Sequence, residues 1–290
     1  MFDFLLAPNV WLLSLAVVLG SMSASAQTKQ LGPDLYAYIS DNDASANSTF
    51  LIGDSEILVV DTGLNATEGA KLLAAIRQIS KLPVKFIVNT HYHPDHQGGN
   101  STVGPDATVI STDYTRARTI DLANVPGMDG FHFRAASLTF EKRIRLYVGR
   151  HAVEVYFPGK GHTSGDAIVY FAEQHAVALG DLFLNRSSPA MDDGSAANWI
   201  DVLDHVLSLP IEKAVPGHFD VGTRADLQRF RDYLNDLYMQ VSFLKNKGES
   251  VDQVRQHIHV EKYSDFRQYP KYHATFADNA ATVYDQLKSP

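Results

Sequence analysis

Three imidazoles and one carboxylate lie within six consecutive residues, in the segment HYHPDH at positions 91–96. If the chain stays extended here, His91 and His93 point the same way, because alternate side chains of an extended segment share a face. A turn at the proline then brings Asp95 and His96 round to an adjacent volume, and the Gly-Gly pair that follows allows close backbone packing. A single His-x-His pair is a weak indication of a metal site, but four donors followed by Gly-Gly are a strong one.

Further metal-ligand types stand at the ends of predicted strands. His162 lies between two strands in the motif GHTSGD, Asp181 closes the next strand, and His218 follows a short apolar pair in the motif PGH. Residues at successive strand ends converge on one edge of a sheet, which is where α/β folds place their sites. The sequence therefore predicts one site assembled from distant segments.

The chain contains no cysteine. Any metal must therefore be held by nitrogen and oxygen, and a thiolate nucleophile is excluded. Imidazole nitrogen suits Zn²⁺, and carboxylates add charge and the ability to bridge two ions. Water bound to such ions loses a proton near neutral pH, which supplies a nucleophile without Ser or Cys.

Apolar periodicity predicts strands in both halves of the chain with helices between them, as in one α/β layered domain. The predicted strands are 35–39, 49–52, 56–60, 84–88, 108–110, 143–148, 152–157, 167–171 and 176–179. The predicted helices are 67–79, 225–245, 251–257 and 275–287.

The N-terminus has the pattern of an export signal. Residues 10–20 form an apolar run that is short for a membrane span, which needs about 20 residues. Ala24 and Ala26 supply an A-x-A cleavage pattern, so we expect a signal peptide over residues 1–26 and an exported body, periplasmic or secreted. An uncleaved anchor is the alternative, because this segment carries Asp3 and no Lys or Arg.

Acidic residues outnumber basic ones by 33 to 25, which gives a formal net charge of -8. Binding to a phosphate backbone needs clustered Lys and Arg, and the chain has no basic run, so we expect no nucleic-acid partner. We expect a small-molecule substrate and no integral membrane domain after signal cleavage. The sequence predicts no particular oligomeric state.

Together the motifs resemble those of the metallo-β-lactamase superfamily. The features that carry the resemblance are Asp61, the His91-x-His93-x-Asp95-His96 signature, His162 in GHTSGD, Asp181, and His218 in PGH. The set is highly specific, and the resemblance covers most of the chain after the expected signal. It implies a four-layer αβ/βα sandwich, with two facing mixed sheets and helices outside. It also implies a single domain over residues 27–290, with a C-terminal helical extension from about residue 224.

The resemblance implies a dinuclear site with two Zn²⁺ per chain, iron being the alternative metal, and a hydroxide between the ions. The implied ligands are two triplets and one bridging carboxylate: His91, His93 and His162; Asp95, His96 and His218; and Asp181. Asp95 and His218 are also expected to act directly in catalysis. Asp61 is expected to orient a ligand histidine or the backbone without touching metal.

Two positions narrow the branch of the family. His96 completes an all-His/Asp second site, where some true lactamases carry Arg. Asp181 stands where true lactamases carry Cys or Ser, and an Asp there resembles the thioesterase, lactonase and broad hydrolase branches.

The leading hypothesis is hydrolysis of a strained or activated carbonyl, such as a β-lactam or lactone ring. Export favours it and disfavours a glutathione thioesterase or a tRNA-processing enzyme. The alternatives are an iron-dependent oxidoreductase that resembles the persulfide dioxygenase branch, and a non-catalytic periplasmic zinc-binding accessory protein.

Several other residues invite a functional interpretation. Arg186 could bind a substrate carboxylate through its planar fork, with a solvated loop arginine as the alternative. The tyrosines at 263, 269 and 272 could line a substrate mouth, with packing as the alternative. We expect Asp192 and Asp193 to be loop acids, and His257 and His259 to be a surface pair.

Overall fold

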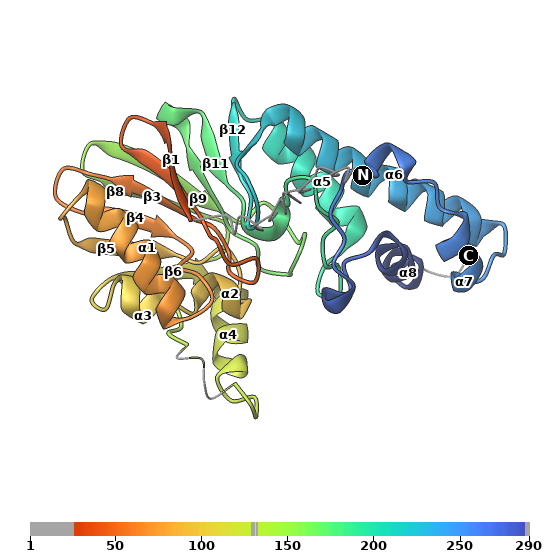
Figure 1. Cartoon of the computed structure of the whole chain (residues 1–290), viewed down its shortest axis with the longest axis horizontal. Coiled ribbons are helices and arrows are strands. Elements are labelled where there is room, and N and C mark those ends of the chain that lie inside the picture. Colours follow the sequence, from red (N-terminus) through yellow and green to blue (C-terminus); the bar gives the residue numbers. More distant parts are fainter. Residues whose placement is uncertain (1–25, 129–130, 132, 288–290) are drawn as a thin grey trace, which may run out of the picture.

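Two facing β-sheets with helices on their outer sides form the body of the molecule (Figure 1). The computed structural model describes residues 26–128, 131 and 133–287. The predicted signal peptide, apart from Ala26, falls outside the described residues. None of the helices within these described ranges combines the length and apolar character needed to cross a membrane.

The first sheet has seven strands in sequence order. Strands β1 to β4 pair antiparallel, and β4 to β7 pair parallel. The strands are β1 (Gln27–Gly32), β2 (Leu35–Ile39), β3 (Ser48–Ile52), β4 (Ile57–Val60), β5 (Val84–Val88), β6 (Thr108–Thr112) and β7 (Leu138–Phe140).

The second sheet has six strands in the order β13-β12-β11-β10-β9-β8. Only β11 and β12 pair parallel, so both sheets are mixed, as predicted. The strands are β8 (Arg143–Val148), β9 (His151–Tyr156), β10 (Ile168–Phe171), β11 (Ala176–Ala178), β12 (Lys213–Val215) and β13 (Gly222–Thr223).

Apolar side chains from the inner faces of both sheets form the central core. Val60 and Val88 of the first sheet pack in one cluster with Val155 and Val169 of the second. Full burial of such a side chain contributes about 1.5–3 kcal/mol, so the sheets stay face to face. This core fixes the relative position of the strand ends that carry the motifs.

Helices α1 (Ala66–Ile79), α2 (Pro94–Gln97), α3 (Asn100–Val103) and α4 (Asp113–Leu122) follow strands of the first sheet. Helix α1 begins where the side chain of Asn65 accepts hydrogen bonds from the backbone N–H groups of Thr67 and Glu68, and it buries Leu72 and Ile76 against the outer face. Helix α4 was not predicted, because its buried positions are Thr115 and Thr119 and leave no apolar stripe.

Helices α5 (Ala196–Leu207), α6 (Arg224–Asn246), α7 (Val251–His257) and α8 (Phe276–Gln286) lie beyond the second sheet (Figure 1). A capping box between Thr223 and Asp226 starts α6. Trp199 of α5 and Phe230 of α6 pack in the same apolar cluster as Val177 of the sheet. Helix α5 was also missed, although its apolar residues recur at helical spacing.

Candidate metal centre

The motif residues lie on five segments that meet at one edge of the two sheets. His91 and His93 follow β5, and Asp95 and His96 lie on α2, whose first residue is the proline of the HYHPDH segment. The remaining three lie in the loop before β10, in a 3-10 turn after β11 and in the loop after β12: His162, Asp181 and His218. Their donor atoms form two groups, and within each group the atoms are within 4.8 Å of one another.

The first group consists of His91, His93, His162 and Asp181. Nδ1 of His93 lies 3.0 Å from Nε2 of His91 and 3.1 Å from Nε2 of His162. Oδ2 of Asp181 lies 3.6 Å from Nε2 of His162. Three ring nitrogens and one carboxylate oxygen therefore face a common volume.

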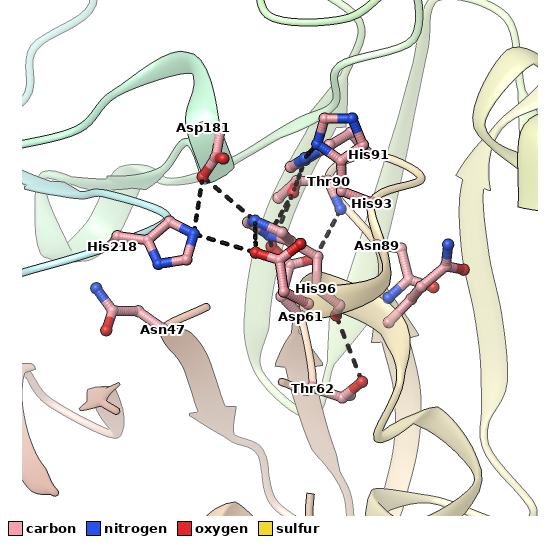
Figure 2. Close-up of polar contacts among 12 residues, drawn as sticks. Asn47, Asp61, Thr62, Asn89, Thr90, His91, His93, His96, Asp181 and His218 are labelled. Carbon is pink, nitrogen blue, oxygen red and sulfur yellow. Dashed lines mark hydrogen bonds and ion pairs between the residues drawn. The ribbon is translucent and has the colours of Figure 1, made fainter. Parts of the chain in front are cut away.

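The second group consists of Asp95, His96 and His218. Oδ2 of Asp95 lies 3.1 Å from Nε2 of His218 and 3.4 Å from Nε2 of His96. Oδ1 of Asp181 lies 3.2 Å from Nε2 of His96 and 3.7 Å from Nε2 of His218 (Figure 2). Asp181 thus reaches both groups, one carboxylate oxygen to each.

The donor set fits metal ions. Nε2 of His96 and Oδ1 of Asp181 are buried and lack a hydrogen-bonding partner with suitable geometry among the described residues. Buried polar atoms ordinarily have such partners. Two neighbouring buried atoms that lack them therefore indicate a position for an ion. Imidazole nitrogens and carboxylate oxygens are ligands for divalent cations. The cluster is therefore able to bind metal ions.

Four buried donors of the cluster differ in their tendency to carry charge. Burial holds the pKa of His91 well below its ordinary value and lowers that of His162 to about 4. Burial also opposes protonation of His96, but the carboxylates of Asp95 and Asp181, with a third behind the ring, hold its pKa well above the ordinary value. Despite burial, the neighbouring imidazoles keep the pKa of Asp181 well below its usual range.

Asp61 lies behind the cluster. Its Oδ2 is 2.8 Å from Nδ1 of His96, and its two oxygens accept hydrogen bonds from the backbone N–H and the hydroxyl of Thr90 (Figure 2). The Thr90 hydroxyl is also 3.1 Å from Nδ1 of His91. Asp61 therefore contacts the far side of a cluster ring, and Thr90 links two such rings.

Two glycines are required by close approach. A Cβ atom on Gly217 would lie 1.8 Å from Oδ1 of Asp181, and one on Gly98 would lie 1.9 Å from the carbonyl oxygen of Leu64. Any larger residue at 217 would displace the carboxylate that reaches both groups. The close packing expected of the glycines after the HYHPDH segment is confirmed.

Asp193 was expected to be a loop acid. It does lie in a loop, but its side chain also contacts the cluster. Its Oδ2 lies 2.9 Å from Nε2 of His93 and accepts a hydrogen bond from the hydroxyl of Tyr92. These contacts hold the pKa of Asp193 below its usual range. The guanidinium of Arg118 lies over the Tyr92 ring, 5.2 Å from its centroid. No local pattern marks Asp193, because its partners lie about a hundred positions away.

Arg186 lies outside both donor groups. It lines an open pocket of about 500 Å³ with Asn185, Asp220, Val221, Asp226, Asp265 and Arg267. The pocket lies beside the cluster, because Leu184 pairs with His218 and the Arg267 guanidinium lies over the ring of Phe219, 4.4 Å from its centroid.

The other singled-out residues have separate places. Tyr263 packs in the core of the C-terminal helices, Tyr269 stacks on Phe219, and Tyr272 is exposed. His257 and His259 each lie near a glutamate at the surface and join neither group.

A two-sheet sandwich with a His/Asp cluster at one edge defines a class of α/β metal-binding proteins. Comparison with known proteins identifies the family: the profile of the Metallo-beta-lactamase superfamily matches residues 41–218, and the chain belongs to that superfamily. Its members are mostly hydrolases with dinuclear metal sites. The predicted family and fold class are therefore confirmed.

Three curated proteins illustrate the range of similar sequences. The chain is 27% identical to metallo-beta-lactamase type 2 of Bacillus cereus over 202 residues, 68% of this chain and 76% of that protein. It is 30% identical to hydroxyacylglutathione hydrolase of a Synechococcus strain over 58% of this chain and 62% of the relative. It is 25% identical to the 2,4-dinitroanisole O-demethylase subunit alpha of a Nocardioides strain, over 58% of this chain and half of the relative.

Solved structures share the fold. A metallo-beta-lactamase from Pontibacter korlensis superposes with a TM-score of 0.63 at 22% identity, over 72% of this chain and 99% of that one. The inverting sec-alkylsulfatase Pisa1 from Pseudomonas sp. superposes with a TM-score of 0.74 at 18% identity, over 91% of this chain and 50% of that one.

Proposed function

We propose that this chain is an exported zinc-dependent hydrolase that opens a β-lactam, a lactone or a similar activated carbonyl. The observation that carries the proposal is the complete donor set, in which two groups share Asp181. In this proposal His91, His93 and His162 hold one ion, and Asp95, His96 and His218 hold the other. Asp61 orients His96 through the contact with Nδ1.

Zinc held in such a site lowers the pKa of water toward neutrality and polarises a carbonyl. The side chains of the protein position the substrate and accept the proton of the attacking water. Asp95 contacts both His96 and His218 through Oδ2, so its Oδ1 is the atom we assign to accept a proton from the attacking water. Asp95 and His218 of the second group and His93 of the first are partly exposed, whereas His96 is fully buried, so we assign the substrate approach to the side where these three residues lie.

Substrate choice involves the neighbouring pocket. Asp220 is paired with Lys29 and Asp265 with Arg229, and Arg186 makes a long contact with Asp226, 4.0 Å from Nη2 to Oδ1. Because the Arg186 side chain is 62% exposed, its guanidinium is accessible to a ligand, beside its backbone partner Arg267. We assign Arg186 to a carboxylate on the substrate, which matches its planar fork. A thioester belongs among the substrates tested because hydroxyacylglutathione hydrolase is a relative.

The test combines metal analysis with a turnover screen. Protein purified with zinc is assayed on β-lactams, lactones, esters and thioesters, each neutral compound paired with a carboxylate-bearing analogue. We expect two zinc ions per chain, turnover of at least one class, and preference for the anionic member of the pair. One iron per chain with oxygen uptake on a persulfide would favour the oxidoreductase instead, and zinc binding without turnover of any substrate would favour an accessory protein.

His93→Ala separates metal-dependent turnover from a contaminating activity. Loss of a ligand lowers metal affinity and activity together, while the core far from the cluster keeps the fold. We expect turnover to disappear and one ion to be lost, with an unchanged circular dichroism spectrum. Unchanged turnover in this variant would contradict the assignment.

A further inference from the structure

The contact between Asp193 and His93 sets which ring nitrogen of His93 faces the cluster. Nδ1 of His93 points to His91 and His162, while Nε2 lies 2.9 Å from Oδ2 of Asp193. A neutral imidazole carries one N–H, and a carboxylate can only accept. Donation from Nε2 to Asp193 therefore leaves the lone pair of Nδ1 directed into the cluster.

Asp193 itself is held in a short loop before α5. Tyr92 donates its hydroxyl to the same Oδ2, and the backbone N–H of Ser195 donates to the carbonyl of Gly161, next to His162, at 3.0 Å. A Cβ atom on Gly194 would lie 2.4 Å from that Gly161 carbonyl oxygen. The loop is thus pressed against the segment that carries His162.

The last residue of α8 closes this loop from outside. Gln286 donates to the carbonyl of Gly194 at 3.1 Å and accepts from the backbone N–H of Ala196 at 2.9 Å. Ser195 precedes α5 but makes no side-chain capping hydrogen bond, so Gln286 supplies the cap from a helix 90 residues away. The side-chain amide of Gln286 therefore bridges Gly194 and Ala196, which closely follow Asp193 in the chain.

We propose that Asp193 is a positioning residue that locks His93 in the Nε2–H tautomer, and that Gln286 of α8 holds Asp193 in place. The C-terminal helix is thereby coupled to one of the two metal sites. The proposal rests on the proposed function in taking His93 as a metal ligand. Partners that fix the tautomer of a ligand histidine typically change metal affinity 10–100-fold when removed.

The first readout is the tautomer of His93 in metal-free protein, measured by ¹⁵N NMR. We expect a proton on Nε2 in the wild type and a mixture of tautomers in Asp193→Ala and Gln286→Ala. Asp193→Asn should retain the wild-type tautomer, because its amide oxygen still accepts from Nε2. Gln228→Ala is the matched control and should change nothing, because the exposed side chain of Gln228 donates its hydrogen bond to Asp232 of its own helix, far from Asp193 in the sequence.

The second readout is zinc affinity by chelator competition. One of the two binding steps should weaken about 10–100-fold in Asp193→Ala and Gln286→Ala, with the other unchanged and Asp193→Asn close to wild type. A wild-type His93 protonated on Nδ1, or a Gln286→Ala variant with unchanged tautomer and affinity, would overturn the proposal. A wild type that binds no zinc would overturn the proposed function, whereas the tautomer measurement would still decide the role of Asp193.

Discussion

At the scale of single residues, the histidines of the cluster form two classes, one with lowered and one with raised pKa values. Burial keeps His91 and His162 neutral, because it lowers the pKa of both rings. The pKa of His96 is held well above its ordinary value by three carboxylates, and that of His218 is raised by Asp181 and Asp95 against the opposing effect of burial. In the metal-free cluster, protonation is therefore favoured at His96 and His218, the two rings that face the carboxylates.

These protons must leave when a metal binds, since an imidazole ligand has to be neutral. The carboxylates of Asp95 and Asp181 release none, because their pKa values are lowered and they are already ionised at neutral pH. Metal affinity should therefore fall as the pH is lowered through the raised pKa values of His96 and His218.

We predict a net release of protons when zinc fills both sites at pH 7. The measurement is calorimetric titration of metal-free protein in two buffers that differ in heat of ionisation. The binding heat should change in proportion to that difference. Heats that are equal in the two buffers would show that His96 and His218 are neutral before the metal arrives.

At the scale of elements, short turns at strand ends decide where the donors lie. The backbone N–H of Gly217, after β12, donates to the carbonyl of Gly180, after β11, at 2.8 Å. This bond joins the turn that carries Asp181 to the loop that carries His218. The two segments are neighbours because β11 and β12 pair parallel, so their carboxyl ends meet at one edge.

Gly217→Ala should therefore damage the centre without unfolding the protein. The new methyl group would lie 1.8 Å from Oδ1 of Asp181 and would displace that oxygen, so we expect zinc affinity to fall about 10-fold or more. Gly248→Ala is the control: its φ of +86° makes alanine unfavourable by about 1–2 kcal/mol. Among the described residues, no non-neighbouring atom lies within 4 Å of the added Cβ, so the Gly248→Ala variant should still bind zinc. Equal zinc affinity in both variants would refute the steric argument.

At the scale of the whole molecule, one apolar cluster runs from the outer face of the second sheet through α5 and α6 to α8. It includes Val177 of the sheet, Leu237 of α6 and Val283 of α8. The C-terminal helices thus share buried surface with the sandwich. We propose that residues 27–290 unfold as one unit, in a single transition.

Two single substitutions on α6, Leu237→Ala and Met239→Ala, test this packing. Leu237 is fully buried, so Leu237→Ala should lower the free energy of unfolding by about 2–5 kcal/mol. Met239, two positions on, is 59% exposed, and its replacement should change that energy by less than about 0.5 kcal/mol. Urea unfolding followed by circular dichroism measures both. Two separate transitions, with only one shifted by Leu237→Ala, would show that the helices fold apart from the sheets.

Local patterns in the sequence were enough to predict many of the strands and helices. The elements Leu35–Ile39, Val84–Val88, Arg143–Val148 and Val251–His257 have the bounds predicted for them, because runs of apolar residues or a helical period mark each one. Strand β1 carries no such signal, since most of its residues are polar and half of them are exposed at a sheet edge. The buried positions of helix α4 are threonines that hydrogen-bond to Gly165 and Gln97. Because these buried residues are polar, the sequence of α4 shows no apolar helical period.

The donor types and their place at strand ends were determined by the sequence alone, because each motif is contiguous and chemically distinctive. Apart from Asp61, which the family resemblance implied, only the tertiary structure decided which side chains support the donors. Asp193 reaches His93 across about a hundred residues, and Gln286 reaches Gly194 across a similar span. Such contacts depend on the packing of two sheets and an outer helix layer, and no short stretch of sequence encodes that packing by itself.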